Sequence, residues 1–499
     1  MTKKKIILIY TDYRKMGTAP YTPDIYTVPL GLLSLSYFLE KEGYKPEILD
    51  TTIDNYKNMN LDNVLCVGFS VMTGAQILNS IEIAQFIRNI NPKIPLVWGG
   101  IHPTLLPEET AKNPLVDVAV KGEGEHTLVE LVKCFESGKP IDKIQGIAYK
   151  NGSTIVSKPF SPMLDMNSIG ILPYHLLNIE KYGTSHSFRL NTSRGCPGRC
   201  KFCSNMASNN KIWRGQDAAK VIEQLSYIVK KFNPGQIIFE EDNFFADPIR
   251  VEKICKSIIE TGLKIKWMGF CRSEHFLTFS RELMNLIKNA GCNYISFGGE
   301  SGSQKILNKI SKGTKPGHMI KATKLCGELG IKPLFSFMSG FPWETSEDLE
   351  ATLNVIDEII KANPAAEISG IFIYTPYPGT PIYDLAIEQG FTPPASMEEW
   401  GTFQFGNTTN VPWVPPGKLS KLKTLLSISR FPFYTKKIIL PPVFQSKHNR
   451  LIAYMFRAFY RFLCFSARSR WRRRFFRFPI EWNIYNWYQK KIRSLSGVV

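Results

Sequence analysis

Three cysteines lie close together in one short segment, "RGCPGRCKFCSN" (residues 194–205). Cys196, Cys200 and Cys203 are separated by glycine, proline, basic residues and one phenylalanine. A structural zinc site normally takes four ligands, and the next cysteine along the chain is Cys255. Three thiolates that hold a 4Fe-4S cluster leave one iron without a protein ligand, and that iron can bind and activate a small molecule. The spacing therefore favours an iron–sulfur site with one open iron over a zinc site.

The cysteine loop directly follows the first of six strand patterns that alternate with helical segments. A series of this kind predicts a partial (β/α)6 barrel, whose active site lies at the carboxyl ends of its strands. The strand patterns cover residues 187–195, 235–244, 264–272, 293–301, 332–342 and 367–380.

An earlier series of apolar strands predicts a doubly wound, flavodoxin-like parallel sheet within residues 1–150. Its strand patterns cover residues 5–10, 45–50, 64–72, 94–100 and 116–124. Ligands of such sheets bind beyond the carboxyl ends of the strands. The loops there read "VPLGLL", "GFSVMTG", "GGIHPT" and "KGEGE", and any one of them alone could be an ordinary turn. Because several share one edge, we expect a binding site that uses Gly31, Ser70, Gly99, Gly100, Gly122 and Glu123.

The segment "CPGRCKFC" resembles the CxxxCxxC loop of radical S-adenosylmethionine enzymes. Downstream segments agree in order: "FEEDNF", "FGGESGSQKILNKISKG", "SGFPWETSEDLEATL" and "YTPYPGTPIYDLA". The resemblance covers residues 187 to about 390. It implies that Cys196, Cys200 and Cys203 hold a 4Fe-4S cluster whose free iron binds S-adenosylmethionine, which one electron cleaves to a 5′-deoxyadenosyl radical.

The same resemblance assigns cofactor contacts to four polar residues. Glu241 and Asp242 end the second barrel strand, where related enzymes contact the methionine part of S-adenosylmethionine. A solvent-facing acidic turn is an equally weighted alternative for this pair. Glu300 and Ser301 resemble positions that contact the methionine carboxylate or the ribose.

The first domain resembles the cobalamin-binding domain of one subgroup of these enzymes, which includes carbon and phosphorus methylases and the anaerobic cyclase of bacteriochlorophyll synthesis. The matching segments are "VPLGLLSLSYFLEKEGY", "VGFSVMT", "VWGGIHPTLLPE" and "VKGEGEHTLVEL". None of the seven histidines stands in the DxHxxG context that supplies a lower-axial ligand in many cobalamin domains. We therefore expect cobalamin without a protein imidazole, and we expect His102 to be a hydrogen-bonding or capping residue.

The formal charge of +19 is concentrated at one end of the 499-residue chain. From Lys418 onward there are 19 Lys and Arg residues and one acidic residue, Glu481. Arg residues recur too often between residues 450 and 468 for a membrane-spanning helix. Arginine mixed with Trp, Phe and Leu is typical of helices that lie in a membrane interface. We therefore give equal weight to two interpretations of residues 418–499, packing on the barrel and peripheral contact with a membrane. Nucleic-acid binding is a less favoured interpretation.

These patterns divide the chain into four parts: a cobalamin-binding domain (1–150), a linker (151–180), a radical S-adenosylmethionine core (181–410) and a basic, aromatic helical extension (411–499). The start "MTKKKIILIY" has too short an apolar run for a secretory signal. The scattered cysteines fit a reducing compartment, so we expect a cytoplasmic protein.

The most favoured function is methyl transfer to an unactivated carbon, for which polar methyl transfer is not reactive enough. The alternative within enzymes is an anaerobic cyclase or another radical oxidoreductase that transfers no methyl group. A sensor without catalytic activity is the alternative outside enzymes. Expected partners are a small-molecule substrate, such as a lipid or isoprenoid, and an external electron donor such as flavodoxin or ferredoxin.

Overall fold

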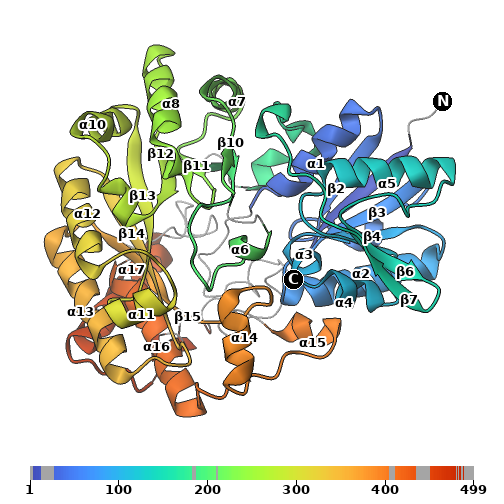
Figure 1. The fold of residues 1–499 in the computed structure, drawn as a ribbon. Helices are drawn as coiled ribbons and strands as arrows, with labels where there is room; N and C mark the ends of the chain where they lie inside the picture. Colours follow the sequence, from blue (N-terminus) through green and yellow to red (C-terminus); the bar gives the residue numbers. More distant parts are fainter. Residues whose placement is uncertain are drawn as a thin grey trace.

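The computed structural model describes residues 4–12, 27–182, 187–208, 212–403, 411–433, 450–478, 480, 481, 483, 484 and 487. These residues form two α/β halves that lie side by side, each built on its own sheet (Figure 1). The first half is blue to teal in Figure 1, and the second half runs from green to orange.

The sheet of the first half has the strand order β2-β1-β3-β4-β5-β6-β7. The five predicted strands pair in parallel, in the order 2-1-3-4-5 that defines flavodoxin-like sheets. Apolar residues such as Ile7 and Val67 are buried in the centre of this sheet. The strands are β1 (Lys5–Tyr10), β2 (Lys45–Asp50), β3 (Val64–Ser70), β4 (Leu96–Gly99), β5 (Val118–Val120), β6 (Ile147–Asn151) and β7 (Thr154–Ser157).

Helices cover both faces of this sheet (Figure 1). They are α1 (Leu30–Lys41), α2 (Ala75–Ile90), α3 (Ile101–Leu105), α4 (Pro107–Lys112) and α5 (Glu125–Ser137), with a 3-10 turn η1 (Tyr56–Asn58) after β2.

The last two strands of the sheet form an antiparallel hairpin that sequence analysis missed. Its two turn residues are Gly152 and Ser153, between the paired residues Asn151 and Thr154, and Gly152 has a φ of +63°. Glycine at the first position of a two-residue hairpin turn is favoured because it tolerates positive φ. The hairpin lies across the expected boundary at residue 150, so the sheet extends into the segment that we expected to be a linker.

The rest of the connection, up to Tyr182, is anchored on both halves. It contains the 3-10 turns η2 (Met166–Ser168), η3 (Tyr174–Leu176) and η4 (Ile179–Tyr182). The hydroxyl of Tyr182 donates to Asp50 at the end of β2 (2.9 Å), and the Gln216 amide in the second half donates to the carbonyl of Met166 (3.1 Å). These bonds fix the position of one half relative to the other.

The second sheet contains the six predicted strands in the order β15-β14-β13-β12-β11-β8, all parallel. Its end strands do not pair with each other, so the barrel is open. The strands are β8 (Phe188–Leu190), β11 (Ile237–Phe239), β12 (Trp267–Cys271), β13 (Cys292–Glu300), β14 (Lys332–Ser339) and β15 (Glu367–Ile373). A separate antiparallel pair, β9 (Ser193–Arg194) and β10 (Arg214–Gly215), brackets the cysteine loop.

Helices follow the barrel strands, and side-chain caps fix where several of them begin. Asp247 caps α8 by accepting from the N–H groups of Ile249 and Arg250, and Thr345 and Asp348 form a capping box at α13. The elements are α6 (Asn205–Ser208), α7 (Ala218–Phe232), η5 (Phe244–Ala246), α8 (Pro248–Glu260), α9 (Ser273–Phe276), α10 (Arg281–Asn289), α11 (Gln304–Lys309), α12 (Pro316–Glu328), α13 (Ser346–Ala362) and α14 (Pro381–Glu388).

The chain then returns to the first half through α15 (Met397–Thr402). There Asn113 donates from its side-chain amide to Glu398 (2.9 Å), and Trp400 is buried with its ring 6.1 Å from that of His102. This helix is a second point of contact between the two halves, in addition to the connection before residue 182.

Two further helices, α16 (Pro416–Phe433) and α17 (Arg450–Arg472), pack on the barrel half. The hydroxyl of Ser429 accepts a hydrogen bond from the backbone N–H of Ile371 on the edge strand β15 (3.2 Å). The indole of Trp471 donates to Asp357 of α13 (2.7 Å). The predicted packing of a helical extension on the barrel is therefore observed for these helices.

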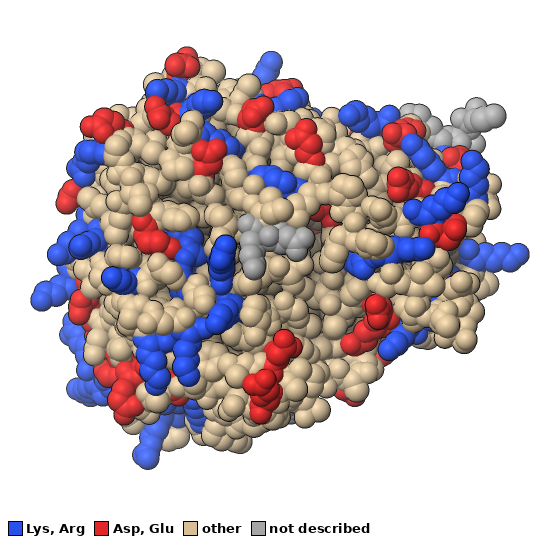
Figure 2. All heavy atoms as spheres, viewed as in Figure 1, with Lys and Arg blue, Asp and Glu red and all other residues tan. Residues whose placement is uncertain are grey.

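No helix among the described residues is long and apolar enough to cross a membrane. On the face seen in Figure 2, basic and acidic side chains are intermixed over both halves. This mixture agrees with the near balance of charge over the first 417 residues.

Candidate functional site

A cavity of about 550 Å3 lies where the carboxyl ends of both sheets face each other. Eight of the residues that sequence analysis singled out line it. The first half contributes Gly31, Ser70, Gly99, Gly100, Gly122 and Glu123, and the barrel half contributes Glu241 and Asp242. The structure thus brings loops from two separately predicted sites into one cavity.

Glycines leave space on the cavity wall formed by the first half. A Cβ atom at Gly31 would have no atom within 4 Å, so a side chain there would project into open space. Gly100 has a φ of +102°, and a Cβ atom there would lie 2.7 Å from the carbonyl oxygen of Val71. At Gly31 backbone atoms can therefore approach a bulky ligand closely, as a B12 cofactor requires, whereas glycine is needed at position 100 because the backbone of Val71 lies so near.

His102 lies between the cavity-lining residues Ile101 and Thr104 along the chain but does not itself line the cavity. It is fully buried, its Nδ1 lies 3.1 Å from the hydroxyl of Thr73, and burial lowers its pKa to about 4. Among the described residues, no histidine lines the cavity. The contact with Thr73 agrees with the expectation of a hydrogen-bonding role for His102.

The three cysteines lie on one loop between β9 and α6. Cys200 is buried and Cys196 and Cys203 are partly buried. Burial raises the pKa of the Cys196 thiol, and it raises the pKa of Cys203 to about 11. Thiolates in this loop therefore need nearby positive charge, which iron ions would supply.

Three thiolates on one loop are the soft ligands that iron–sulfur clusters take. Within the described residues, no three His, Cys, Asp or Glu side chains are arranged to hold one ion. In a cluster each iron takes its own thiolate, so the sulfur atoms need not converge on one point. The N–H of Gly198 points at the Cys196 sulfur (3.4 Å), as hydrogen bonds to cluster ligands do.

Arg272, which sequence analysis did not single out, contacts the cysteine loop. Its Nη1 donates to the Cys200 sulfur at 3.2 Å, its Nη2 donates to the carbonyl of Lys312, and its Nε donates to Glu274 at 2.5 Å. The guanidinium is thus held on three sides and places positive charge against one thiolate. Burial opposes this charge, but Cys200 and Glu274 outweigh burial and raise the pKa of Arg272.

Glu241 and Asp242 fasten the loop that carries the cysteines. Glu241 accepts hydrogen bonds at 2.5 Å from the backbone N–H and the hydroxyl of Thr192. Asp242 accepts from the N–H of Gly195 at 3.1 Å, and burial raises the pKa of both carboxyl groups. Glu241 is buried, whereas Asp242 is exposed where it lines the cavity, so the alternative of a solvent-facing acidic residue stays open for Asp242. Contact with S-adenosylmethionine stays a prediction for both.

Glu300 and Ser301 lie outside the cavity lining. Glu300 has a φ of +62° at an irregularity in the pairing of β13 with β14, and its carboxylate pairs with Lys312 at 2.8 Å. Since the Lys312 carbonyl accepts from Arg272, Glu300 is connected to Cys200 through two residues. Ser301 is fully buried and lies 3.1 Å from the hydroxyl of Thr352. Their predicted cofactor contacts stay predictions.

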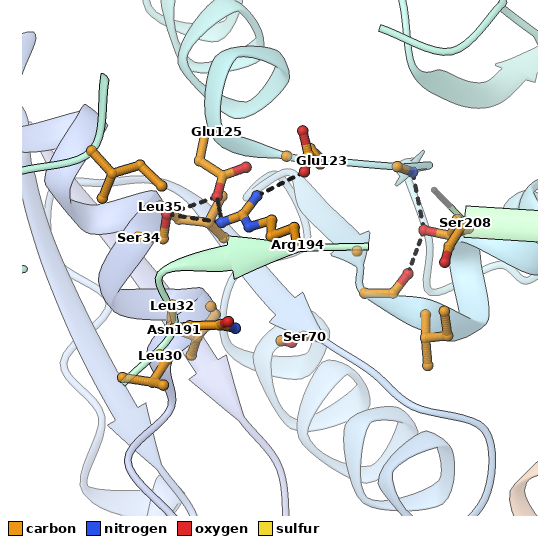
Figure 3. A pocket seen from close by; sticks show the side chains of 18 of the residues that line it. Leu30, Leu32, Ser34, Leu35, Ser70, Glu123, Glu125, Asn191, Arg194 and Ser208 are labelled. Atoms are coloured by element: carbon orange, nitrogen blue, oxygen red, sulfur yellow. Dashed lines mark hydrogen bonds and ion pairs between the residues drawn. The ribbon is translucent and has the colours of Figure 1, made fainter. Parts of the chain in front are cut away.

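A buried ion-pair cluster joins the two halves at the rim of the cavity (Figure 3). Arg194 of β9 lies between Glu125 (2.5 Å), Glu123 (3.1 Å) and the hydroxyl of Ser34 (3.3 Å). Arg214 also pairs with Glu123, at 2.7 Å. Burial alone would raise the pKa of Glu123 and Glu125. The positive charges and hydrogen bonds of the arginines outweigh burial, so the pKa of each carboxyl group lies below its ordinary value. Because Arg194 precedes Gly195 and Cys196, this cluster ties the cysteine loop to the first half.

The arginines of this site carry no local sequence signal. Arg194 and Glu123 are 71 positions apart, and Arg272 and Cys200 are 72 positions apart. A spacing rule links residues within one loop or helix turn, so these pairs become visible only in the folded chain.

Comparisons with known proteins agree with this geometry. Residues 190–356 match the model of the Radical SAM superfamily, and residues 22–132 match the model of the B12 binding domain. The matched segments contain the cysteine loop and the glycine-containing loops of the first half. The uncharacterized methyltransferase PH0819 of Pyrococcus horikoshii is 33% identical over 370 residues, which cover 72% of this chain and 78% of that protein.

Two further relatives are more distant. The anaerobic magnesium-protoporphyrin IX monomethyl ester cyclase of Cereibacter sphaeroides is 29% identical over 316 residues, or 60% of this chain. The solved structure of OxsB, a cobalamin-dependent S-adenosylmethionine radical enzyme with aqua-cobalamin and S-adenosylmethionine bound, superposes with a TM-score of 0.61 at 22% identity over 71% of this chain. The chain spans about half the length of these two proteins, 50% and 52% respectively.

Proposed function

Since the chain belongs to the radical S-adenosylmethionine enzymes that carry a B12-binding domain, we propose that it is a methyltransferase that acts on an unactivated carbon. The single observation that carries the proposal is the shared cavity. It has glycine loops of the B12-binding half on one side, and Asp242 and Arg194, which contact or adjoin the cysteine loop, on the other.

The residues of the site have separate tasks in this proposal. When bound, the cluster and S-adenosylmethionine supply a 5′-deoxyadenosyl radical, and cobalamin supplies a methyl group. Cys196, Cys200 and Cys203 hold the cluster, and Gly31, Gly99 and Gly100 admit the corrin ring to the wall of the cavity. Burial between the two halves keeps water away from a reactive radical.

Labelled S-adenosylmethionine tests this function. The reduced, reconstituted protein is incubated with methyl-labelled S-adenosylmethionine, cobalamin and candidate substrates, and both 5′-deoxyadenosine and labelled product are measured. We expect both products from the unmodified protein and neither from Cys200→Ala, which loses a cluster ligand. Cys134→Ala removes a cysteine of α5 outside the loop and is the matched control. A protein that makes no 5′-deoxyadenosine would instead be a sensor.

Relatives named as cyclases keep a second reaction open, namely radical oxidation or cyclisation without methyl transfer. The same assay separates the two, because a cyclase forms 5′-deoxyadenosine and leaves the substrate unlabelled. Methyl transfer is the stronger proposal, since the relative with the higher identity and coverage is named a methyltransferase.

The partners follow from the chemistry. The enzyme acts on a small molecule and needs a reductant, and we propose flavodoxin or ferredoxin as the external electron donor. A lipid or isoprenoid substrate, a cytoplasmic location and contact of residues 418–499 with the membrane complete the proposal. The basic, aromatic composition of that segment supports the membrane contact and the lipid-like substrate.

A further inference from the structure

One face of α17 exposes arginine and aromatic side chains together. It consists of Tyr454, Arg461, Phe462, Phe465, Arg468 and Arg472 and is called the arginine–aromatic face. Successive spacings of seven, four, three and four residues separate Tyr454, Arg461, Phe465, Arg468 and Arg472. These spacings place the five side chains on one side of the helix. The three aromatic side chains are 69%, 62% and 71% exposed in order along the chain.

The opposite side of α17 holds the helix in a fixed orientation. Leu463, Ala467 and Trp471 are buried there, and the Trp471 indole donates to Asp357 of α13. Arg474, just after the helix, pairs with Glu350 (3.0 Å) and with Asp357 (2.9 Å). The packed side is therefore already satisfied by the barrel, and the arginine–aromatic face is directed away from it.

The acidic residue of the basic segment does not offset this charge at the surface. Glu481 is buried, and it pairs with Arg470 and accepts from the hydroxyl of Ser466 (2.7 Å). Beyond the end of the helix the same composition continues, with exposed Arg473, Arg477, Phe478 and Ile480. An exposed apolar area ringed by one sign of charge is a feature of interaction surfaces.

We propose that the arginine–aromatic face binds the surface of an anionic lipid bilayer, with α17 parallel to the membrane plane. Arginine guanidinium groups would pair with lipid phosphates while Tyr454, Phe462 and Phe465 enter the boundary between headgroups and acyl chains. The inference rests on the folded extension and is independent of which reaction the cavity performs.

The shape of the surface favours a bilayer over nucleic acid. Proteins that bind single strands combine a basic groove with aromatic side chains on which bases stack. The side of one helix is convex, and its aromatic residues lie between the arginines along the same line. A broad, deformable surface such as a membrane can contact all six residues at once.

Vesicle sedimentation tests the proposal with the full chain. The protein is mixed with vesicles of phosphatidylcholine alone or of phosphatidylcholine with phosphatidylglycerol, and the bound fraction is measured at low and high salt. We expect binding to the anionic vesicles, which salt weakens. The variant Arg461→Glu/Arg468→Glu/Arg472→Glu should bind at least about 100-fold more weakly, because each basic residue near such a surface contributes roughly a factor of five and each glutamate adds repulsion. Phe462→Ser/Phe465→Ser should also bind more weakly.

A control variant makes the same change of charge elsewhere. Lys253→Glu/Lys321→Glu/Lys324→Glu alters three exposed lysines of α8 and α12 and should bind vesicles as the unmodified protein does. All variants should form 5′-deoxyadenosine normally in vesicle-free solution, which separates this proposal from the proposed reaction. Equal loss in the control variant, equal binding to uncharged vesicles, or binding of an oligonucleotide in place of vesicles would each overturn the proposal.

Discussion

At the scale of single residues, Arg272 is the side chain through which the barrel can tune the cluster. Hydrogen bonds and positive charge near a cluster sulfur stabilise the reduced, more negative form. Arg272 offers both to Cys200, at 3.2 Å. We expect Arg272→Met to lower the reduction potential of the reconstituted cluster by about 60–130 mV, the equivalent of a charged hydrogen bond of ~1.5–3 kcal/mol. Redox titration followed by electron paramagnetic resonance measures this shift.

The conservative variant separates charge from geometry in this prediction. Arg272→Lys keeps the positive charge but cannot reach Cys200, Glu274 and the Lys312 carbonyl together, so its potential should lie between the other two. Arg281→Met changes an exposed arginine that pairs with Glu328 at the surface and should leave the potential unchanged. A potential that is the same in all four proteins would show that Arg272 has only a structural role.

Residues that belong to a local motif were predictable, and residues that act across the fold were not. Gly31, Ser70 and Gly122 stand at the ends of strands with a clear apolar pattern, so their place at one edge followed from the sheet type. Arg194 and Arg272 are ordinary basic residues in the sequence. Their function depends on which carboxylate or thiolate the fold places beside them.

At the scale of elements, α16 protects the edge strand β15 of the open barrel. An unpaired strand edge exposes N–H groups that can pair with another chain. Ser429 satisfies one of them, on Ile371. We expect Ser429→Ala to destabilise the protein by about 1–3 kcal/mol, because it leaves a buried N–H without an acceptor. Hydrogen exchange should become faster at Ile371.

Ser427→Ala is the matched control for this change. Ser427 is equally buried, but its hydroxyl donates to the Thr424 carbonyl within the same helix. Its removal should leave exchange at Ile371 unchanged. Equal acceleration of exchange in both variants would indicate that α16 loosens as a whole and would contradict a specific cap on β15.

The elements themselves were mostly predictable, because their apolar periods are strong. All eleven predicted strands of the two large sheets are present. β1 and β2 have the predicted bounds, β13 is shifted by one residue, and the other eight are narrower than predicted. The hairpin of β6 and β7 was missed although Gly152-Ser153 is a turn signal. Both strands are partly exposed, with the short patterns IAYKN and TIVS, so neither shows the continuous apolar run that marked the buried strands.

At the scale of the whole molecule, the cavity exists only while the two halves stay in contact. The contact depends on the connection before Tyr182, on α15 and on the buried cluster around Arg194. The connection also lines the cavity, through Met166, Ile169 and Leu172, and the cluster both lines the cavity and adjoins the cysteine loop. Changes in it should therefore affect stability and cofactor binding together.

We expect Arg194→Met to destabilise the full chain by about 3–5 kcal/mol near neutral pH, because Glu125 is then buried without its arginine. In the unmodified protein the pKa of Glu125 is lower in the folded state than in the unfolded state, where it is about 4.5. The ionised carboxylate therefore stabilises the fold above pH 4.5, and this stabilisation is lost as the pH falls through the folded-state pKa. In the variant, burial alone raises the pKa, so stability is lost as pH rises. The difference in melting temperature between the two proteins should therefore be largest at pH 7 and shrink toward pH 4.

The double variant Arg194→Met/Glu125→Gln decides whether the unpaired carboxylate causes this loss. In the unmodified protein the Ser34 hydroxyl donates to Glu125 at 2.7 Å. The neutral amide of a glutamine at position 125 can keep this hydrogen bond without burying a charge. We therefore expect the double variant to regain much of the stability at pH 7 and to lose the pH dependence of the single variant. Cobalamin binding, followed by its visible absorption, should stay weaker in both variants, because the arginine link from β9 to Glu123 at the cavity wall is absent. Unchanged cobalamin affinity would mean that the cluster stabilises the fold without shaping the cavity.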